Sequence, residues 1–254
     1  MDFISEQFSN IYLNFYIILT VAILYLFLHA NRHNKVLQQV SILLGFFPVL
    51  IHEVGHALSA SISGGKVHNI YMVLTPRGQE KTESQGYAVT TPKNRLSGVL
   101  IGLMGYMFPP FIYLLGIILL YNQMSVAFLS ILLLLTLYYF WHTSQKWIPL
   151  LLLLGLIYSV YYVYTNSIEV TISMYLIHFI YNLILGLLLG EIIQSIIITT
   201  KVNFSRQKME WDGLMLRRLT FIPATVWWFV WTVASGFTIY MTFKILIDVF
   251  PLSS

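Results

Sequence analysis

The sequence of 254 residues contains no cysteine and few charged residues. Without cysteine the chain forms no disulfide and no thiolate metal site, so a bound zinc ion must use nitrogen and oxygen ligands. Only 9% of the residues are charged and 57% are hydrophobic, whereas about 25% are charged in an ordinary soluble domain. This imbalance predicts a polytopic membrane protein. The small net charge of +4 argues against nucleic-acid binding.

Cationic residues are missing from the first residues as well, where Asp2 and Glu6 are the only charges before an apolar run. That run is long enough to span a bilayer, so we expect a retained first helix and no cleavable signal peptide. In all, seven apolar segments are long enough, or nearly so, to cross about 30 Å of hydrocarbon. They predict one all-α integral membrane domain over residues 1–254. The segments are approximately 11–30, 37–63, 96–121, 124–141, 147–163, 170–199 and 219–246.

Lys and Arg are distributed unevenly between the connections of these segments. If the N-terminus and the even-numbered connections share one side, that side holds eleven of the fourteen cations. Because cytoplasmic loops are enriched in Lys and Arg, we expect a multi-pass protein of the cell membrane with a cytoplasmic N-terminus and an outside C-terminus. The eleven are Lys66, Arg77, Lys81, Lys93, Arg95, Lys146, Lys201, Arg206, Lys208, Arg217 and Arg218, against Arg32, Lys35 and Lys244.

Residues 64–95 do not have the pattern of a helix. Residues 66–75 and 86–91 are rich in β-formers, and Pro76-Arg77-Gly78 is a turn signal. We therefore predict a hairpin-like excursion that dips against the membrane or the mouth of a site. The alternative is a disordered loop, which would expose the apolar residues 70–74 to water.

His52-Glu53-Val54-Gly55-His56 lies inside the second apolar segment. Two histidines four residues apart share one face of a helix, so both imidazoles can bind one Zn²⁺. Glu53 would lie beside the ion as a general base. Ionisable groups at membrane depth are costly, which makes an accidental cluster a poor explanation. The charge asymmetry places the motif toward the cytoplasm.

A catalytic zinc ion usually has three protein ligands and one water. On the side of the membrane that carries the histidines, the acidic candidates are Glu191, Glu210 and Asp212. Asp212 stands where the chain enters the seventh segment, within the third-ligand segment 203–218. It could instead be a helix N-cap or a solvated acid near Arg217 and Arg218.

These residues resemble the site-2-protease-type intramembrane zinc metalloproteases, in particular their compact bacterial branch. The resemblance spans residues 45–235, although an Asn-Pro pair before Asp212 and room for a PDZ module are missing. The residues that carry it are His52-Glu53-Val54-Gly55-His56-Ala57-Leu58, Ser63-Gly64-Gly65-Lys66-Val67, Gly105-Tyr106, Pro109-Pro110, Asp212, Leu216, Thr220, Pro223 and Trp227-Trp228.

The resemblance implies a zinc metalloendopeptidase of the HExxH type that cuts a peptide bond within or beside the bilayer. It implies that His52, His56 and Asp212 bind Zn²⁺, and that zinc-activated water attacks the carbonyl while Glu53 accepts its proton. The expected partners are a transmembrane or membrane-associated protein substrate and the lipid bilayer. A non-catalytic scaffold and, less well supported, an ion or proton transporter are the alternatives.

Polar and small residues on other segments suggest close packing between helices. His178, Asn182, Gly186, Gly190 and Gln194 recur every four residues, and Glu191 is adjacent. This stripe predicts interhelical hydrogen bonds, or a water path lined by Asn182 or Glu191, with Glu191 as an alternative zinc ligand. Gly98, Gly102 and Gly105 predict a close approach to the zinc-site helix 37–63, with a substrate groove as the alternative.

Overall fold

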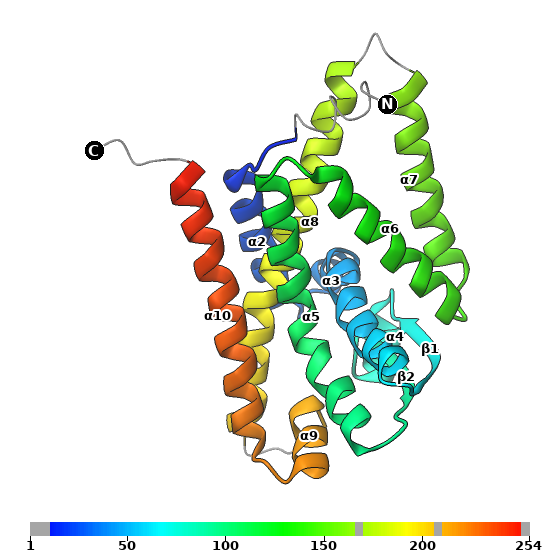
Figure 1. Ribbon diagram of the computed structural model, residues 1–254, viewed down its shortest axis with the longest axis vertical. Coiled ribbons are helices and arrows are strands. Elements are labelled where there is room, and N and C mark those ends of the chain that lie inside the picture. The colour runs from blue at the N-terminus through cyan, green and yellow to red at the C-terminus, as the bar shows by residue number, and fades with distance from the viewer. Residues whose placement is uncertain (1–10, 166–169, 206–209, 250–254) are drawn as a thin grey trace.

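The computed structural model describes residues 11–165, 170–205 and 210–249, which form a mostly helical fold with one small antiparallel sheet (Figure 1). Arg206 and Lys208, which are part of the sidedness argument, and Asp2 and Glu6, which are part of the signal-peptide argument, lie outside the described residues. The elements are α2 (Phe15–Ala30), α3 (Lys35–Ile62), β1 (Lys66–Met72), α4 (Pro76–Thr82), β2 (Gly86–Thr91), α5 (Arg95–Tyr121), α6 (Ser125–His142), α7 (Trp147–Thr165), α8 (Val170–Phe204), α9 (Asp212–Thr220) and α10 (Ala224–Val249).

Each of the seven predicted apolar segments contains a helix. Among the described residues, five helices are long and apolar enough to cross a membrane, which supports a multi-pass membrane protein. Helix α2 is apolar but has only 16 residues, so the total of seven spans stays a prediction. The five stretches are Lys35–Ile62, Arg95–Tyr121, Ser125–His142, Tyr175–Phe204 and Ala224–Ile245.

The last predicted segment, 219–246, is not continuous. Helix α9 ends at Thr220, Phe221 adopts a left-handed backbone with φ of 63°, and α10 begins at Ala224. Pro223, just before α10, has no N–H to continue the helical ladder. The start predicted at residue 219 is therefore wrong, and the polar α9 is an element of its own.

Helix α5 lies in the middle of the bundle and packs against α3, α6, α8, α9 and α10 (Figure 1). Helix α8 also packs closely on α2, because two glycines of α8 leave room for that helix. A Cβ at Gly186 would meet Val21, and one at Gly190 would meet Tyr25. The close packing predicted from the stripe of small residues on α8 is confirmed.

Residues 64–95 form a hairpin with a short helix at its tip. Strands β1 and β2 pair antiparallel from Lys66↔Thr91 to Met72↔Gly86, so a disordered loop is excluded. The expected turn at Pro76-Arg77-Gly78 is instead the first turn of α4. Thr75 Oγ1 accepts the Gly78 N–H as an N-cap. Proline has no backbone N–H, and it is tolerated at the first position of a helix because the helix offers no hydrogen-bond acceptor there.

The hairpin runs back along almost the whole of α3. It follows Ile62, the last residue of α3, and returns to the beginning of that helix. Near the tip, Gln85 Nε2 donates to the Ile42 carbonyl and Gln38 Nε2 donates to Gln79 Oε1. Between residues 62 and 38 a helix rises by roughly 36 Å. The hairpin is therefore packed along α3, and its tip reaches the end of that helix opposite to Ile62.

This course changes the count of cations. Arg77 and Lys81 belong to α4, so they lie at the same end of α3 as Arg32 and Lys35. If α3 crosses the membrane, these two cations lie on the side opposite to the other cations of residues 64–95. Reassigning Arg77 and Lys81 to the other side changes the count of Lys and Arg from eleven against three to nine against five. The asymmetry keeps its direction, and the sidedness of the protein stays a prediction.

Candidate metal centre

Helix α3 places His52 and His56 one turn apart on the same face. Their Nε2 atoms are 3.1 Å apart, and their rings meet edge to face. The two rings face Gly105 of α5, where an added Cβ would overlap both imidazoles. The missing side chain at this position therefore creates the space for the two histidines.

The hydrogen bond of His56 to α5 determines which ring nitrogen faces the site. His56 Nδ1 lies 2.7 Å from the Ile101 carbonyl oxygen, which can only accept, so Nδ1 carries the proton. In the neutral ring, Nε2 then presents its lone pair to the site. A second hydrogen bond of this kind is typical of metal-binding histidines, because it holds the tautomer and the ring orientation.

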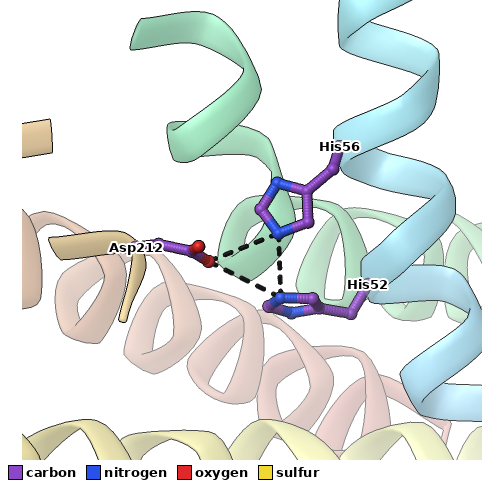
Figure 2. Close-up of side chains that lie close together, drawn as sticks. All are labelled: His52, His56 and Asp212. Carbon is purple, nitrogen blue, oxygen red and sulfur yellow. Dashed lines mark hydrogen bonds and ion pairs between the residues drawn. The ribbon is translucent and has the colours of Figure 1, made fainter. Parts of the chain in front are cut away.

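Asp212 reaches the two histidines from α9, a separate element (Figure 2). Its Oδ2 lies 3.3 Å from His56 Nε2 and 3.6 Å from His52 Nε2. Helix α9 is held on α5 by Leu216, which is fully buried and contacts the position where Gly102 lacks a side chain. The fold thus brings together residues that are 160 and 156 positions apart in the sequence.

The surroundings favour an ionised Asp212. Burial raises the pKa of its carboxyl, but the adjacent His56 and His52 outweigh that effect and hold the pKa below its ordinary value. The side chain is 23% exposed. Trp211 is the residue that precedes the first helical position, so Asp212 is not the N-cap of α9.

The three donor atoms fit one tetrahedral zinc ion. All of them lie within 4.8 Å of one another, and the three separations are 3.1, 3.3 and 3.6 Å. Two ligand atoms that are each about 2.0–2.1 Å from a tetrahedral zinc ion lie roughly 3.3 Å apart. Two imidazoles and one carboxylate are also a usual donor set of catalytic zinc.

Glu53 lies beside this triangle and is not part of it. Its side chain is buried next to β2, where the N–H of Ala88 is directed at the carboxylate and Gly86 lies close to its Cγ. Helix α3 turns Glu53 away from the two histidines of the same turn and toward the hairpin. A carboxylate that is near the ligand triangle but free of it is available for proton transfer.

The sequence model of the Peptidase M50B-like family matches residues 11–242, nearly the whole chain. The chain belongs to this family. The resemblance to site-2-protease-type peptidases is thereby confirmed, and M50 peptidases are in general zinc metalloproteases. Comparisons with curated proteins and with solved structures give no significant match.

In this M50B-like chain, the other two acidic candidates lie apart from the triangle. Glu191 on α8 accepts hydrogen bonds from Tyr25 Oη and, at 2.8 Å, from Ser195 Oγ. Glu210 is exposed and pairs with Arg218. Among the described residues, the only group of three or more possible ligands is the one that contains Asp212.

Asn182 has a structural position in this M50B-like fold. It is fully buried, donates to the His178 and Tyr12 carbonyls, and accepts the N–H of Asn14. It therefore ties α8 to the start of α2, and it does not line the cavity that reaches His52. Of the two residues proposed for a water path, only Glu191 lines that cavity.

The three glycines of α5 do not share one partner. Gly105 faces the histidines of α3, but a Cβ at Gly102 or Gly98 would meet residues of α9. The prediction that all three approach the zinc-site helix is correct for Gly105 only. The helical spacing showed that they share a face, but it contained no sign that a second element, α9, covers part of it.

Several groups around this M50B-like site have no signature in the sequence. The Ile101 carbonyl that orients His56 is a backbone atom, and no residue type marks it. Tyr106 packs its ring edge to face on His52 and against Trp231. The sequence indicated a place near the site for Tyr106 only through the pair Gly105-Tyr106 of the family resemblance.

We expect Gly105→Ala to weaken zinc binding by about 10- to 100-fold, the effect of disturbing groups that orient metal ligands. The added methyl would displace His52 and His56. Zinc affinity is measured by competition with a chromogenic chelator. The matched control is Gly236→Ala on α10, where nothing lies within 4 Å of the added Cβ. Equal zinc affinity in the two variants would contradict the close approach.

Proposed function

We propose that this chain is an intramembrane zinc metalloprotease that cleaves a peptide bond of a transmembrane or membrane-associated protein. The observation that carries the proposal is the triangle of His52, His56 and Asp212 with Glu53 beside it. Both histidines and Glu53 belong to α3, which is long and apolar enough to span a membrane. Membership of a peptidase family supports the same conclusion.

The residues of the site take separate roles in this mechanism. His52, His56 and Asp212 would hold zinc, which when bound supplies an activated water and polarises the scissile carbonyl. Glu53 takes the proton of the attacking water and passes it to the leaving amine. Because Glu53 is buried beside β2, its carboxylate is held near the place where the substrate backbone would enter.

Hydrolysis at membrane depth also needs water. A cavity of about 270 Å³ is lined by His52 and Glu53, together with Arg32, Glu191 and Gln194. Liquid water occupies about 30 Å³ per molecule, so the cavity has room for several. Its polar lining supports a water supply to Glu53 through the bundle.

In this proposal, an unwound substrate adds to the edge of β2 that, within the described residues, pairs with no strand. On the outer edge of β1, the Met72 N–H and carbonyl are both bonded to the Gln145 side chain, at 2.8 and 3.0 Å. Asn69 bonds to Ser144 on the same edge. The loop between α6 and α7 thereby closes β1, and β2 keeps the edge that faces Glu53.

The register of the hairpin shows which groups point to that edge. Met72 is paired with Gly86 but turns its own N–H and carbonyl outward, so this is a pair without mutual hydrogen bonds. By alternation, Gly86 and Ala88 direct their backbone groups away from β1. The Ala88 N–H accordingly points at Glu53. A substrate strand added here would lie next to the general base.

Strand addition predicts that N-methylation of a substrate peptide blocks cleavage at alternate backbone positions near the scissile bond. Only every second N–H of an added strand points toward β2. The measurement is cleavage of an N-methyl scan of one cleaved peptide. A series in which neighbouring positions behave alike would exclude docking on this edge.

Zinc dependence tests the proposed function directly. The full chain is reconstituted in vesicles with a panel of synthetic single-span peptides, and products are identified by mass spectrometry. We expect about one zinc ion per chain, loss of cleavage after chelation, and recovery when zinc is added back. Cleavage that persists without zinc would overturn the mechanism. Zinc binding without cleavage of any peptide would favour the scaffold alternative.

A further inference from the structure

A second cavity, of about 580 Å³, lies between the end of α8, helix α9 and the start of α10. Its lining includes Asn203, Trp211, Leu214, Arg217, Arg218 and Thr225. Asp212, His52 and Glu53 are absent from that lining, so a ligand in this cavity would leave the metal centre free. The proposed function makes no use of this cavity.

The cavity lies where membrane-spanning helices end. Helix α8 ends at Phe204 and α10 begins at Ala224, and both contain candidate spans. Apolar side chains stand exposed around it: Phe204 is 64% exposed and Phe221 is 82% exposed. Trp211 lines the cavity, and tryptophan is typical of the membrane–water interface, which supports a place for the cavity at the depth of lipid headgroups.

The charge of this region is positive. Arg217 and Arg218 both line the cavity, and Arg218 pairs with Glu210. Within the described part of the chain, Arg217 makes no ion pair with an acidic group. Arg95, at the start of α5, lies 4.9 Å above the Phe221 ring. The described lining of the cavity thus carries two guanidinium groups and one carboxylate, that of Glu210, and Arg95 lies against the Phe221 side chain of the same lining.

We propose that this cavity binds the phosphate of an anionic phospholipid, with Arg217 and Arg218 as its main contacts. Guanidinium groups match phosphate oxygens in charge and geometry, and basic pockets between transmembrane helices bind anionic headgroups. The exposed Phe204 and Phe221 beside the pocket give the acyl chains an apolar surface. An acidic segment of a soluble protein would leave that apolar surface in water, which favours a lipid.

A bound headgroup would contact the helix that begins with Asp212. Arg217 is five residues after Asp212 on α9, roughly 7.5 Å along the helix axis. The lipid would therefore connect α9 to the end of α8 and the start of α10. This consequence concerns the position of α9 and does not depend on peptidase activity.

Binding is measured by native mass spectrometry on the full chain, with phosphatidylglycerol and phosphatidylcholine of identical acyl chains. We expect wild type to retain phosphatidylglycerol preferentially. Arg217→Gln with Arg218→Gln should weaken that retention by about 30-fold, because each cation near an anionic lipid contributes a several-fold gain in affinity. Phosphatidylcholine retention should not change.

Two further variants separate charge from folding. Arg217→Lys with Arg218→Lys keeps both charges and should retain most of the binding. Arg77→Gln with Lys81→Gln removes two exposed cations from α4 and should have no effect. Thermal unfolding in phosphatidylcholine micelles should be the same for all variants, since both arginines are exposed.

Three results would overturn the proposal. The first is equal retention of phosphatidylglycerol by wild type and the double glutamine variant. The second is displacement of the lipid by inorganic phosphate, which would indicate a site for free phosphate. The third is displacement by a soluble polyglutamate peptide, which would indicate a surface for an acidic protein.

Discussion

Glu53→Gln is expected to abolish peptide cleavage and to leave the bound zinc in place. Glu53 lies outside the triangle of His52, His56 and Asp212, so its replacement removes no zinc ligand. A glutamine has the same size and its side-chain oxygen can still accept the Ala88 N–H, so the contact with β2 is kept. What is lost is the ability to take a proton.

The expected decrease in cleavage rate is about 10²- to 10⁴-fold, the range over which a positioned general base contributes. Zinc content and cleavage are measured on the same preparation. Glu80→Gln is the matched control, because Glu80 is exposed on α4 and undergoes the same chemical change. Cleavage by Glu53→Gln at the wild-type rate would refute the mechanism, and loss of zinc would instead make Glu53 a structural part of the site.

The local parts of this site follow from short-range rules. His52 and His56 are four residues apart, and the helical repeat alone puts them on one face. The apolar segments are helices because a backbone in lipid must satisfy its own hydrogen bonds. The hairpin followed from two runs rich in β-formers on either side of the turn signal Pro76-Arg77-Gly78. Each of these signals is contained within a few turns of the chain.

The parts that sequence reasoning missed depend on distant contacts. The break between α9 and α10 lies inside an apolar run. Pro223 is compatible with it, but no residue type in the sequence marks the left-handed backbone of Phe221 that ends α9. Nothing in residues 64–95 indicates that the hairpin turns back along α3. The closure of β1 by Gln145 joins residues 73 positions apart, and the carbonyl that orients His56 belongs to Ile101.

The third zinc ligand was only partly predictable from the sequence. The sequence narrowed it to Glu191, Glu210 and Asp212, and the choice of Asp212 came from resemblance to a family. The structure supplies an independent reason, because α9 packs on α5 and brings only Asp212 to the histidines among the described residues. Its role as a ligand remains the proposal that a variant can test most directly.

Asp212→Ala is expected to lower zinc affinity by at least about 100-fold. Disturbing a group that only orients a metal ligand costs 10- to 100-fold, so removal of a ligand should cost more. The variant also removes the negative charge that Asp212 brings to the two histidines. Zinc affinity is measured by chelator competition, and residual cleavage is measured at saturating zinc.

Glu210→Ala is the matched control for this prediction. Glu210 is two residues away and also acidic, but its side chain is exposed and bonded to Arg218. Both changes remove an acid near the start of α9, so any effect on the helix dipole, about 0.3–1 kcal/mol, is shared. A loss of zinc in Asp212→Ala alone identifies the ligand. Equal zinc affinity in Asp212→Ala and wild type would remove Asp212 from the site and leave the two histidines of α3 as the only ligands that the geometry supports.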